Sequence, residues 1–316
     1  DLKRRPEAAR SVLERFVSQN ENAASSPNFA SQTSDPLGGV VMLLSVAQMD
    51  ETLLLLVLKT LKILSRKYDN RVRLGGLICD DLVAVLEANA SGDPAVAAEA
   101  ANVVLNICYE KENVVRIMTA GGVSPLLRLL DRPEPDLRAN AAGAIQSICF
   151  QREGRIAVRE EGAIPALLPL LSADSLRVQT RAVGAIHNLS SEAEAIRAIR
   201  KLRGVAPLVA LLRAPSASVC GSAAGALQNL SREMQARQEI HELGAVLPLV
   251  DLLLGDDVQS QVCAAGALLN VLGPSLGPEE GKNPKRAALK KLLSLGLTVG
   301  MLHGSLRGGP DGVGDG

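Results

Sequence analysis

Residues 141–149 read AAGAIQSIC, and the same pattern returns as AVGAIHNLS at 182–190, AAGALQNLS at 223–231 and AAGALLNVL at 264–272. The step between these strings is 41 residues each time. Self-similarity at a period of about 40–47 residues is typical of helical solenoids. A single unit of this size cannot bury its apolar faces alone, so stacked neighbours must supply the core. The repeat therefore predicts an all-α solenoid that acts by presenting a long surface.

Glycine and proline divide each unit into three expected helices. Gly121-Gly122 ends the first helix of the clearest unit, because glycine readily adopts the left-handed conformation that follows a helix. Gly75-Gly76 is interpreted as the same kind of helix end. Pro133 and Pro135 separate the second helix from a longer third helix. The three helices are expected over residues 113–120, 125–130 and 136–150.

This three-helix unit resembles the armadillo repeat. GAIPALLPLL at 162–171, GAVLPLVDLL at 244–253 and the third-helix strings quoted above carry the resemblance. It covers about residues 70–272 and is weaker over 37–69. The resemblance implies a right-handed α-solenoid, a superhelix of armadillo repeats with about six three-helix units plus a partial seventh.

The ends of the chain depart from the repeat pattern. A short amphipathic helix is expected over residues 5–18. The absence of an initiator Met leaves open whether the sequence is a fragment of a longer protein. The expected organisation is an N-terminal helix with a Ser/Asn-rich linker in 1–36, armadillo repeats in 37–272, an inserted loop in 273–283, a partial repeat or C-terminal cap in 284–303, and a disordered Gly-rich tail in 304–316.

Composition excludes several classes of function. With 34 basic and 34 acidic residues, the net charge gives no reason to expect nucleic-acid or membrane-surface binding. No apolar stretch is long enough for a membrane span. The three histidines are far apart and no catalytic or phosphate-binding motif occurs, so we expect no enzyme, cofactor, metal site or small-molecule substrate. Five cysteines without a C-x-x-C pair indicate buried thiols in a reducing compartment.

The resemblance also implies a binding surface. In armadillo proteins the third helices line a concave groove, where a column of Asn commonly holds the backbone of an extended peptide. An amide side chain suits this role because it both donates and accepts hydrogen bonds. The same residues could instead tie one unit to the next, and the two roles are compatible. The column here is Asn106, Ser147, Asn188, Asn229 and Asn270, with Lys62 as the expected equivalent in the first unit.

Residues beside the Asn column are further candidates for partner contacts. One turn after the column lie aromatic or basic side chains, which could anchor a partner residue or fill space between units. One residue before it lie polar side chains with the same two alternatives. These candidates are Tyr109, Phe150 and Arg232, and Gln146, His187 and Gln228.

Two basic clusters have alternative interpretations. The first could receive an acidic partner or form a solvated helix face, and it comprises Arg197, Arg200, Lys201 and Arg203. The second is a dispersed run that could act as a nuclear localisation signal, and it comprises Lys282, Lys285, Arg286, Lys290 and Lys291.

Nuclear import adaptors of this family carry Trp four residues before each ladder Asn. This chain has no Trp, and its residues there are Asn102, Gly143, Gly184, Gly225 and Gly266. The aromatic shelves that hold lysine side chains are therefore missing, which disfavours an import adaptor.

The sequence thus predicts a non-catalytic scaffold that binds a partner protein, as an extended segment or a helix, along the concave groove. A structural subunit of a cytoskeletal or axonemal assembly and the substrate-binding region of a larger ubiquitin ligase are the alternatives. The expected location is the cytoplasm, with cytoskeletal or ciliary placement and nuclear entry left open.

Overall fold

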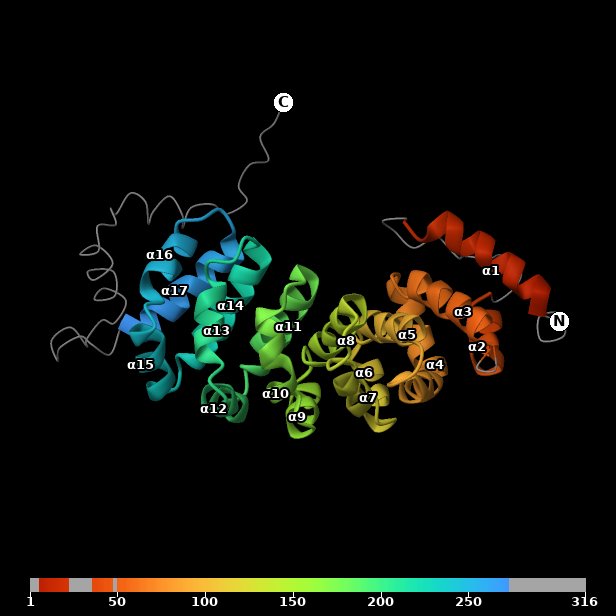
Figure 1. Ribbon diagram of the computed structural model, residues 1–316, viewed down its shortest axis with the longest axis horizontal. Coiled ribbons are helices and arrows are strands. Elements are labelled where there is room, and N and C mark those ends of the chain that lie inside the picture. Colours follow the sequence, from red (N-terminus) through yellow and green to blue (C-terminus); the bar gives the residue numbers. More distant parts are fainter. Residues whose placement is uncertain (1–5, 23–35, 48–49, 273–316) are drawn as a thin grey trace, which may run out of the picture. The chain divides into compact units, whose positions relative to one another are not determined.

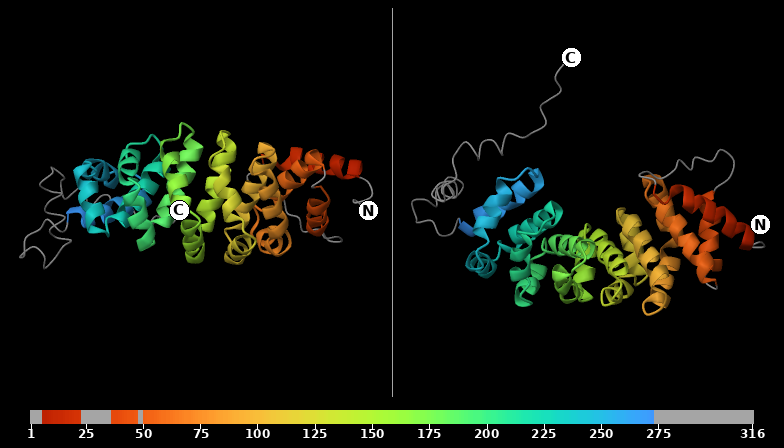
Figure 2. Two further views of the ribbon diagram at one scale, coloured as in Figure 1. Left: turned by 60° about the horizontal axis from the view of Figure 1, so that its bottom comes forward. Right: turned by 45° about the horizontal axis from the view of Figure 1, so that its top comes forward.

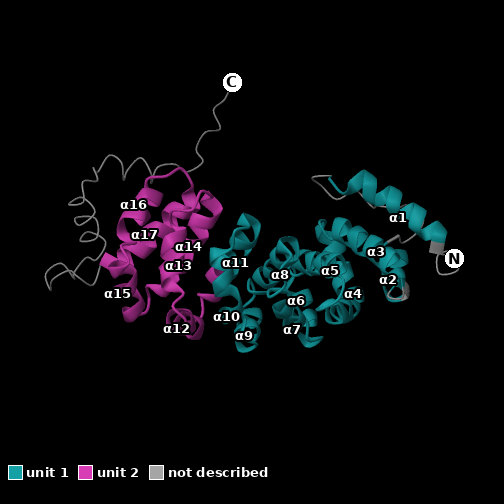
Figure 3. Cartoon of the chain, viewed as in Figure 1, with its two compact units in different colours: residues 1–185 teal, residues 186–316 magenta. Residues whose placement is uncertain are grey.

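The computed structural model describes residues 6–22, 36–47 and 50–272, and all regular elements in these ranges are helices (Figure 1). Most of the expected linker, the inserted loop, the partial repeat and the Gly-rich tail lie outside the described residues. The chain divides into two compact units, residues 1–185 and 186–316 (Figure 3). Within each unit, successive repeats follow one another in chain order (Figure 2). The all-α solenoid predicted from the 41-residue step is confirmed.

Each complete repeat consists of a short first helix, a second helix and a longer third helix, as predicted. The first helices are α6 (Lys111–Thr119), α9 (Arg152–Glu160), α12 (Ala193–Lys201) and α15 (Met234–Glu242). The second helices are α7 (Val123–Leu129), α10 (Ala163–Leu167) with the 3₁₀ turn η2 (Leu168–Ser172), α13 (Val205–Leu211) and α16 (Val246–Leu253). The third helices are α3 (Glu51–Leu64), α5 (Pro94–Ile107), α8 (Pro135–Ile148), α11 (Leu176–Leu189), α14 (Ala217–Leu230) and α17 (Val258–Leu272).

One helix, α4 (Tyr68–Asn89), replaces both the first and second helices of its repeat. The expected helix end at Gly75-Gly76 is therefore wrong, because both residues lie inside α4. A Cβ on Gly75 would lie 1.5 Å from the side-chain oxygen of Asn113, so this glycine permits close packing. Gly121, which does end α6, has a φ of +79°. Counted from the helix starts, Ile78 is its counterpart in α4, and a β-branched residue does not readily adopt that conformation.

Small residues allow the third helices to pack closely. In unit 1, α5 packs against α8, and in unit 2, α14 packs against α17. The alanines three residues apart on these helices are fully buried, as Ala141 and Ala144 illustrate in α8. The second helices add a column of fully buried leucines, each worth about 1.5–3 kcal/mol of hydrophobic stabilisation. This column consists of Leu126, Leu167, Leu208 and Leu249.

The first described helix, α1 (Pro6–Asn20), packs against α3. Its apolar face is buried at i, i+4 and i+8, through Ala9, Leu13 and Val17. Arg66, in the turn after α3, donates to the backbone carbonyl oxygens of Asn20 and Glu21 at the C-terminal end of α1, at 3.3 and 3.0 Å. The helix α2 (Pro36–Ala47) also packs against α3. Thus α1 and α2 both bury apolar surface against α3.

Candidate functional site

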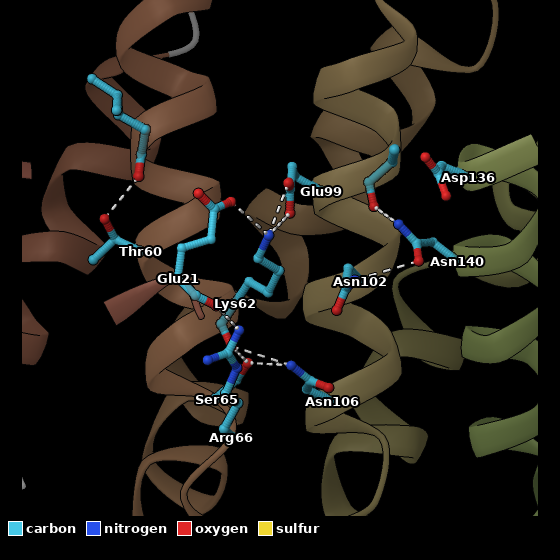
Figure 4. Close-up of polar contacts among 12 residues, drawn as sticks. Glu21, Thr60, Lys62, Ser65, Arg66, Glu99, Asn102, Asn106, Asp136 and Asn140 are labelled. Atoms are coloured by element: carbon cyan, nitrogen blue, oxygen red, sulfur yellow. Dashed lines mark hydrogen bonds and ion pairs between the residues drawn. The ribbon is translucent and has the colours of Figure 1, made fainter. Parts of the chain in front are cut away.

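The Asn column lies one or two residues before the last residue of each third helix, where the helix backbone has unpaired carbonyl groups. In unit 1, Asn106 Nδ2 lies 3.0 Å from Ser65 Oγ and 3.2 Å from the carbonyl oxygen of Lys62 (Figure 4). Ser65 is fully buried directly after α3. The Asn106 amide therefore ties α5 to the end of the preceding third helix.

Unit 2 repeats this tie. Asn229 Nδ2 donates to Ser190 Oγ at 3.0 Å, and Asn270 Nδ2 donates to Ser231 Oγ at 2.9 Å. Both serines are fully buried. Each bond fixes the orientation of the amide, so its carbonyl oxygen has a defined direction. Among the described residues, no hydrogen bond reaches Oδ1 of Asn106, Asn229 or Asn270.

The other two members of the column differ. Asn188 is half-buried near the end of α11, and Ser147 is buried near the end of α8. A serine reaches less far than an asparagine, so Ser147 interrupts the row of amides.

Lys62 does not belong to the Asn column. Asn229 and Asn270 each donate to the serine two residues after the preceding ladder position. The serine that accepts from Asn106 is Ser65, which lies two residues after Ile63. The residue in the column is Ile63, which is fully buried. The expectation that Lys62 is the first ladder residue is therefore wrong. Lys62 instead falls in the column of Gln146, with its side chain beside α5.

A hollow of about 420 Å³ lies in unit 1 over the third helices, near the start of the ladder. Two ion pairs lie in its lining: Lys62 Nζ is 2.9 Å from Glu99, and Arg177 is 2.6 Å from Asp136 (Figure 4 shows Glu99, Lys62 and Asp136). The hollow is lined by Leu55, Lys59, Lys62, Pro94, Ala95, Ala98, Glu99, Asn102, Glu134, Asp136, Leu137, Asn140 and Arg177.

A buried amide organises the wall of this hollow. Asn140 donates to the carbonyl oxygen of Ala98 at 2.9 Å, and its own Oδ1 accepts from Asn102 at 3.3 Å and from Arg177 at 2.6 Å. Such a set of fixed donors and acceptors suits a peptide backbone better than an apolar ligand. The sequence interpretation missed Asn140 and Glu99, although Glu99 lies two turns before Asn106 on the same helix.

The polar residues before the Asn column lie at the seam between repeats. A Cβ on Gly184 would lie 2.3 Å from Gln146 Nε2, and a Cβ on Gly225 would lie 2.4 Å from His187 Nε2. Gly266 and Gln228 have the same relation, at 2.1 Å. The glycine column therefore exists because the preceding repeat's side chain lies on it. Burial lowers the pKa of His187 from its ordinary value of 6.5.

The aromatic candidates are exposed and lie together. Tyr109 and Phe150 follow the ends of α5 and α8, with ring centroids 6.2 Å apart. Arg71 lies 5.6 Å from the Tyr109 ring and 5.8 Å from the Tyr68 ring. The sequence interpretation missed Tyr68 and Arg71, although Tyr68 also follows a third helix. In unit 2, Arg232 follows α14 and is exposed.

The basic cluster around α12 is largely paired. Arg200 forms an ion pair with Glu233 at 2.9 Å, and Arg197 lies 3.8 Å from Glu194. Arg203 has a φ of +59°, in the place where other repeats have glycine. Lys201 is exposed at the end of α12. The second basic run, residues 282–291, lies outside the described residues.

No constellation for catalysis or metal binding occurs among the described residues. The five cysteines are buried and free, and burial raises the pKa of Cys79 to about 12, so this thiol is a poor nucleophile. The described ranges contain no group of three or more potential metal ligands. Within the same ranges, no helix is long and apolar enough to cross a membrane.

Comparison with known proteins gives consistent results. Residues 111–150, 151–191 and 193–232 match the Armadillo/beta-catenin-like repeat. No curated protein sequence matches the chain.

Solved structures resemble it over most of its length. A crystallised engineered protein is 30% identical, with a TM-score of 0.69, and the match covers 75% of this chain and 97% of that one. A designed armadillo repeat protein is 27% identical, with a TM-score of 0.69 and coverage of 74% and 99%. Another designed armadillo repeat protein, in complex with the peptide (KR)4, is 27% identical, with a TM-score of 0.66 and coverage of 75% and 100%.

Proposed function

The chain belongs to the armadillo repeat family, and on this premise we propose that it is a non-catalytic scaffold that binds a partner protein. The partner lies as an extended segment along the surface formed by the third helices. The observation that carries this proposal is the row of ladder amides, oriented by their bonds to the serines of the preceding repeat. Backbone pairing of this kind gives affinity without a requirement for particular partner side chains.

The amide geometry supports binding through the carbonyl oxygen. Asn106, Asn229 and Asn270 each use Nδ2 for the tie to a serine. The tie removes the rotational freedom that an amide would otherwise lose on binding, which lowers the entropic cost of association. Each Oδ1 can then accept a hydrogen bond from a backbone N–H of the partner.

Two further observations support the proposal. One of the designed armadillo proteins that resemble this chain has a bound peptide, which shows that the fold suits peptide ligands. The glycine column is occupied by side chains of the preceding repeats, so it has no room for the Trp shelves of import adaptors. We also propose a cytoplasmic location, supported by five thiols that form no disulfide.

The test is selection of peptides from a random displayed library on the wild-type chain. Isothermal titration then gives the affinity of the selected peptides for the double variant Asn188→Ala with Asn229→Ala. We expect a roughly ten-fold or larger loss of affinity, as for the removal of hydrogen bonds at the centre of an interface.

A matched control separates binding from stability. Ser190→Ala removes the acceptor of the Asn229 tie but leaves the amide in place. We expect Ser190→Ala to lower stability by about 1 kcal/mol and to weaken affinity less than the double variant does, because the amide that accepts the partner's N–H remains. Equal affinity of the selected peptides for the wild-type chain and the folded double variant contradicts binding through the ladder.

A further inference from the structure

Three of the chain's five aromatic residues form an exposed row on unit 1, which we call the aromatic edge: Tyr68, Tyr109 and Phe150, with Arg71 between the first two. Their exposed fractions are 60%, 51% and 54%. The Tyr109 and Phe150 rings are tilted by 31° to each other. Each ring lies shortly after a different third helix, so the edge extends across three successive repeats. Tyr68 is the first residue of α4, and Tyr109 and Phe150 lie in the turns after α5 and α8.

Arg71 fixes the middle of the row. Its guanidinium donates to Glu110 at 2.8 Å and to the carbonyl oxygen of Arg66 at 3.0 Å. Its position near both tyrosine rings is a cation–π arrangement. The rings are therefore held in place while about half of each remains exposed. Exposed aromatic side chains that are already fixed lose little entropy on binding, which is typical of interface anchors.

The chain segments that contain the rings have a net positive charge. We define an edge segment as the eight residues that begin two residues after the end of a third helix. The three edge segments of unit 1 are residues 66–73, 109–116 and 150–157, and together they contain eight basic and four acidic residues. A net charge of +4 around an apolar row favours an acidic partner and raises its rate of association.

From the exposed rings and this charge we propose that the aromatic edge binds an acidic, proline-containing extended segment of a partner protein. Proline rings pack on flat aromatic faces, and a polyproline II segment is already extended, so its binding costs little conformational entropy. Carboxylates between the prolines then lie among the surplus basic residues. Tyr109 and Phe150 lie three residues after ladder positions, but the proposal rests on the rings and the charge and does not depend on peptide binding by the ladder amides.

Aromatic residues with basic neighbours also occur in proteins that bind single-stranded nucleic acid. The edge differs from such surfaces because acidic residues alternate with the basic ones. Glu110 lies beside Arg71, and Glu153 lies 3.9 Å from Lys111. A phosphate backbone carries a negative charge at every nucleotide and must meet these carboxylates, whereas a peptide with spaced carboxylates can place its charges between them.

The experiment measures fluorescence anisotropy of a labelled peptide of alternating glutamate and proline, added to the full chain. The test variant is Tyr109→Ser with Phe150→Ser, which copies the residue found after α11, Ser191. We expect the wild-type chain to bind the peptide and the variant to bind it roughly ten-fold or more weakly. The single variant Tyr109→Phe keeps the ring and should retain binding.

Matched controls make the result specific. Met234→Ser removes an equally prominent apolar side chain, 70% exposed, from the start of α15 in unit 2, and should leave binding unchanged. A lysine–proline peptide and a glutamate–glycine peptide should both bind more weakly than the glutamate–proline peptide. Circular dichroism checks that the variants remain folded.

Three results would overturn the proposal. They are unchanged peptide binding by the folded Tyr109→Ser, Phe150→Ser variant, equal binding of the lysine–proline peptide, and ring-dependent binding of oligothymidylate tighter than that of the peptide. Asn188→Ala with Asn229→Ala should leave binding of this peptide unchanged. Failure at the edge can therefore be distinguished from failure at the ladder.

Discussion

The edge segments, each a turn after a third helix together with the start of the next helix, are the same structural element in both units, but their surfaces differ. In unit 1 the edge segments contain three exposed aromatic rings and a net charge of +4. In unit 2 the corresponding segments, residues 191–198 and 232–239, contain no aromatic residue and have a net charge of −1. The helices before these turns nevertheless have the same length in α5, α8, α11 and α14.

This difference separates packing from recognition. Positions that hold one repeat against the next scarcely vary between the units, because any change there opens a cavity or causes a clash. Positions on the turns meet solvent and can change without loss of the fold. The turns of unit 1 are therefore the part of the repeat in which this chain has acquired a distinct surface.

The largest loss of stability that we expect tests whether the two units share one packing scheme. Leu126 in unit 1 and Leu208 in unit 2 occupy the same column and are both fully buried. Leu126→Ala and Leu208→Ala should each lower the free energy of unfolding of the affected unit by about 3 kcal/mol, through lost burial and a residual cavity. Hydrogen exchange of the amides in each unit measures the two losses separately.

The control for this pair is Val115→Ala, which truncates an exposed side chain and should change stability by less than about 0.5 kcal/mol. If Leu126→Ala and Leu208→Ala differ by more than about 2 kcal/mol, the units do not share one packing scheme.

The fold followed from the sequence because the same packing problem is solved in each repeat. Small residues such as Ala141 recur every 41 residues, and the glycine that ends α6 recurs as Gly162 and Gly244, both with positive φ. The 41-residue period is interrupted at α4, which is one helix where other repeats have two. The ends of α3 and α5 lie 43 residues apart, whereas the ends of α5 and α8 lie 41 apart. The regular step therefore does not locate the first ladder position, and the alignment of KTLKILSRKYDN with VVLNICYEKEN placed Lys62 there, one residue before Ile63.

The candidate site was predictable only in part. The column of Asn106, Asn229 and Asn270 could be read from spacing, since it depends on one helix position. The hollow beside Asn140 and the contacts of Arg71 could not, because they join side chains of different repeats. Side-chain direction between repeats depends on helix packing, which a linear pattern does not specify.

A smaller loss of stability is expected from substitutions in the glycine column, where neighbouring repeats meet. Gly225→Ala should destabilise unit 2 by about 1–2 kcal/mol, because the new Cβ meets atoms of the rigid His187 ring at 2.4 and 2.5 Å. Gly184→Ala in unit 1 should be nearly neutral, because the flexible end of Gln146 can rotate away and alanine favours the helix. Thermal unfolding and hydrogen exchange measure both effects.

A double-mutant cycle isolates the cause. If the ring is the obstacle, His187→Ala should remove most of the penalty of Gly225→Ala, which gives a coupling free energy above about 0.5 kcal/mol. Additive effects of the two substitutions would show that the glycine is required for another reason.

The smallest effect that we expect is a pH dependence present in unit 2 and absent at the matching seam of unit 1. Burial lowers the pKa of His187 below 6.5, so below this pH the unfolded chain binds a proton that the folded chain resists. Stability should therefore fall as the pH decreases from about 6.5 towards the lowered pKa. His187→Gln, which copies Gln146, should abolish this component.

The measurement is urea unfolding of both proteins between about pH 7.5 and 5.5, followed by subtraction of the two curves. Other groups titrate equally in both proteins and cancel in the difference. A difference that does not change over this range would show that His187 is as accessible to protonation in the folded chain as in the unfolded one.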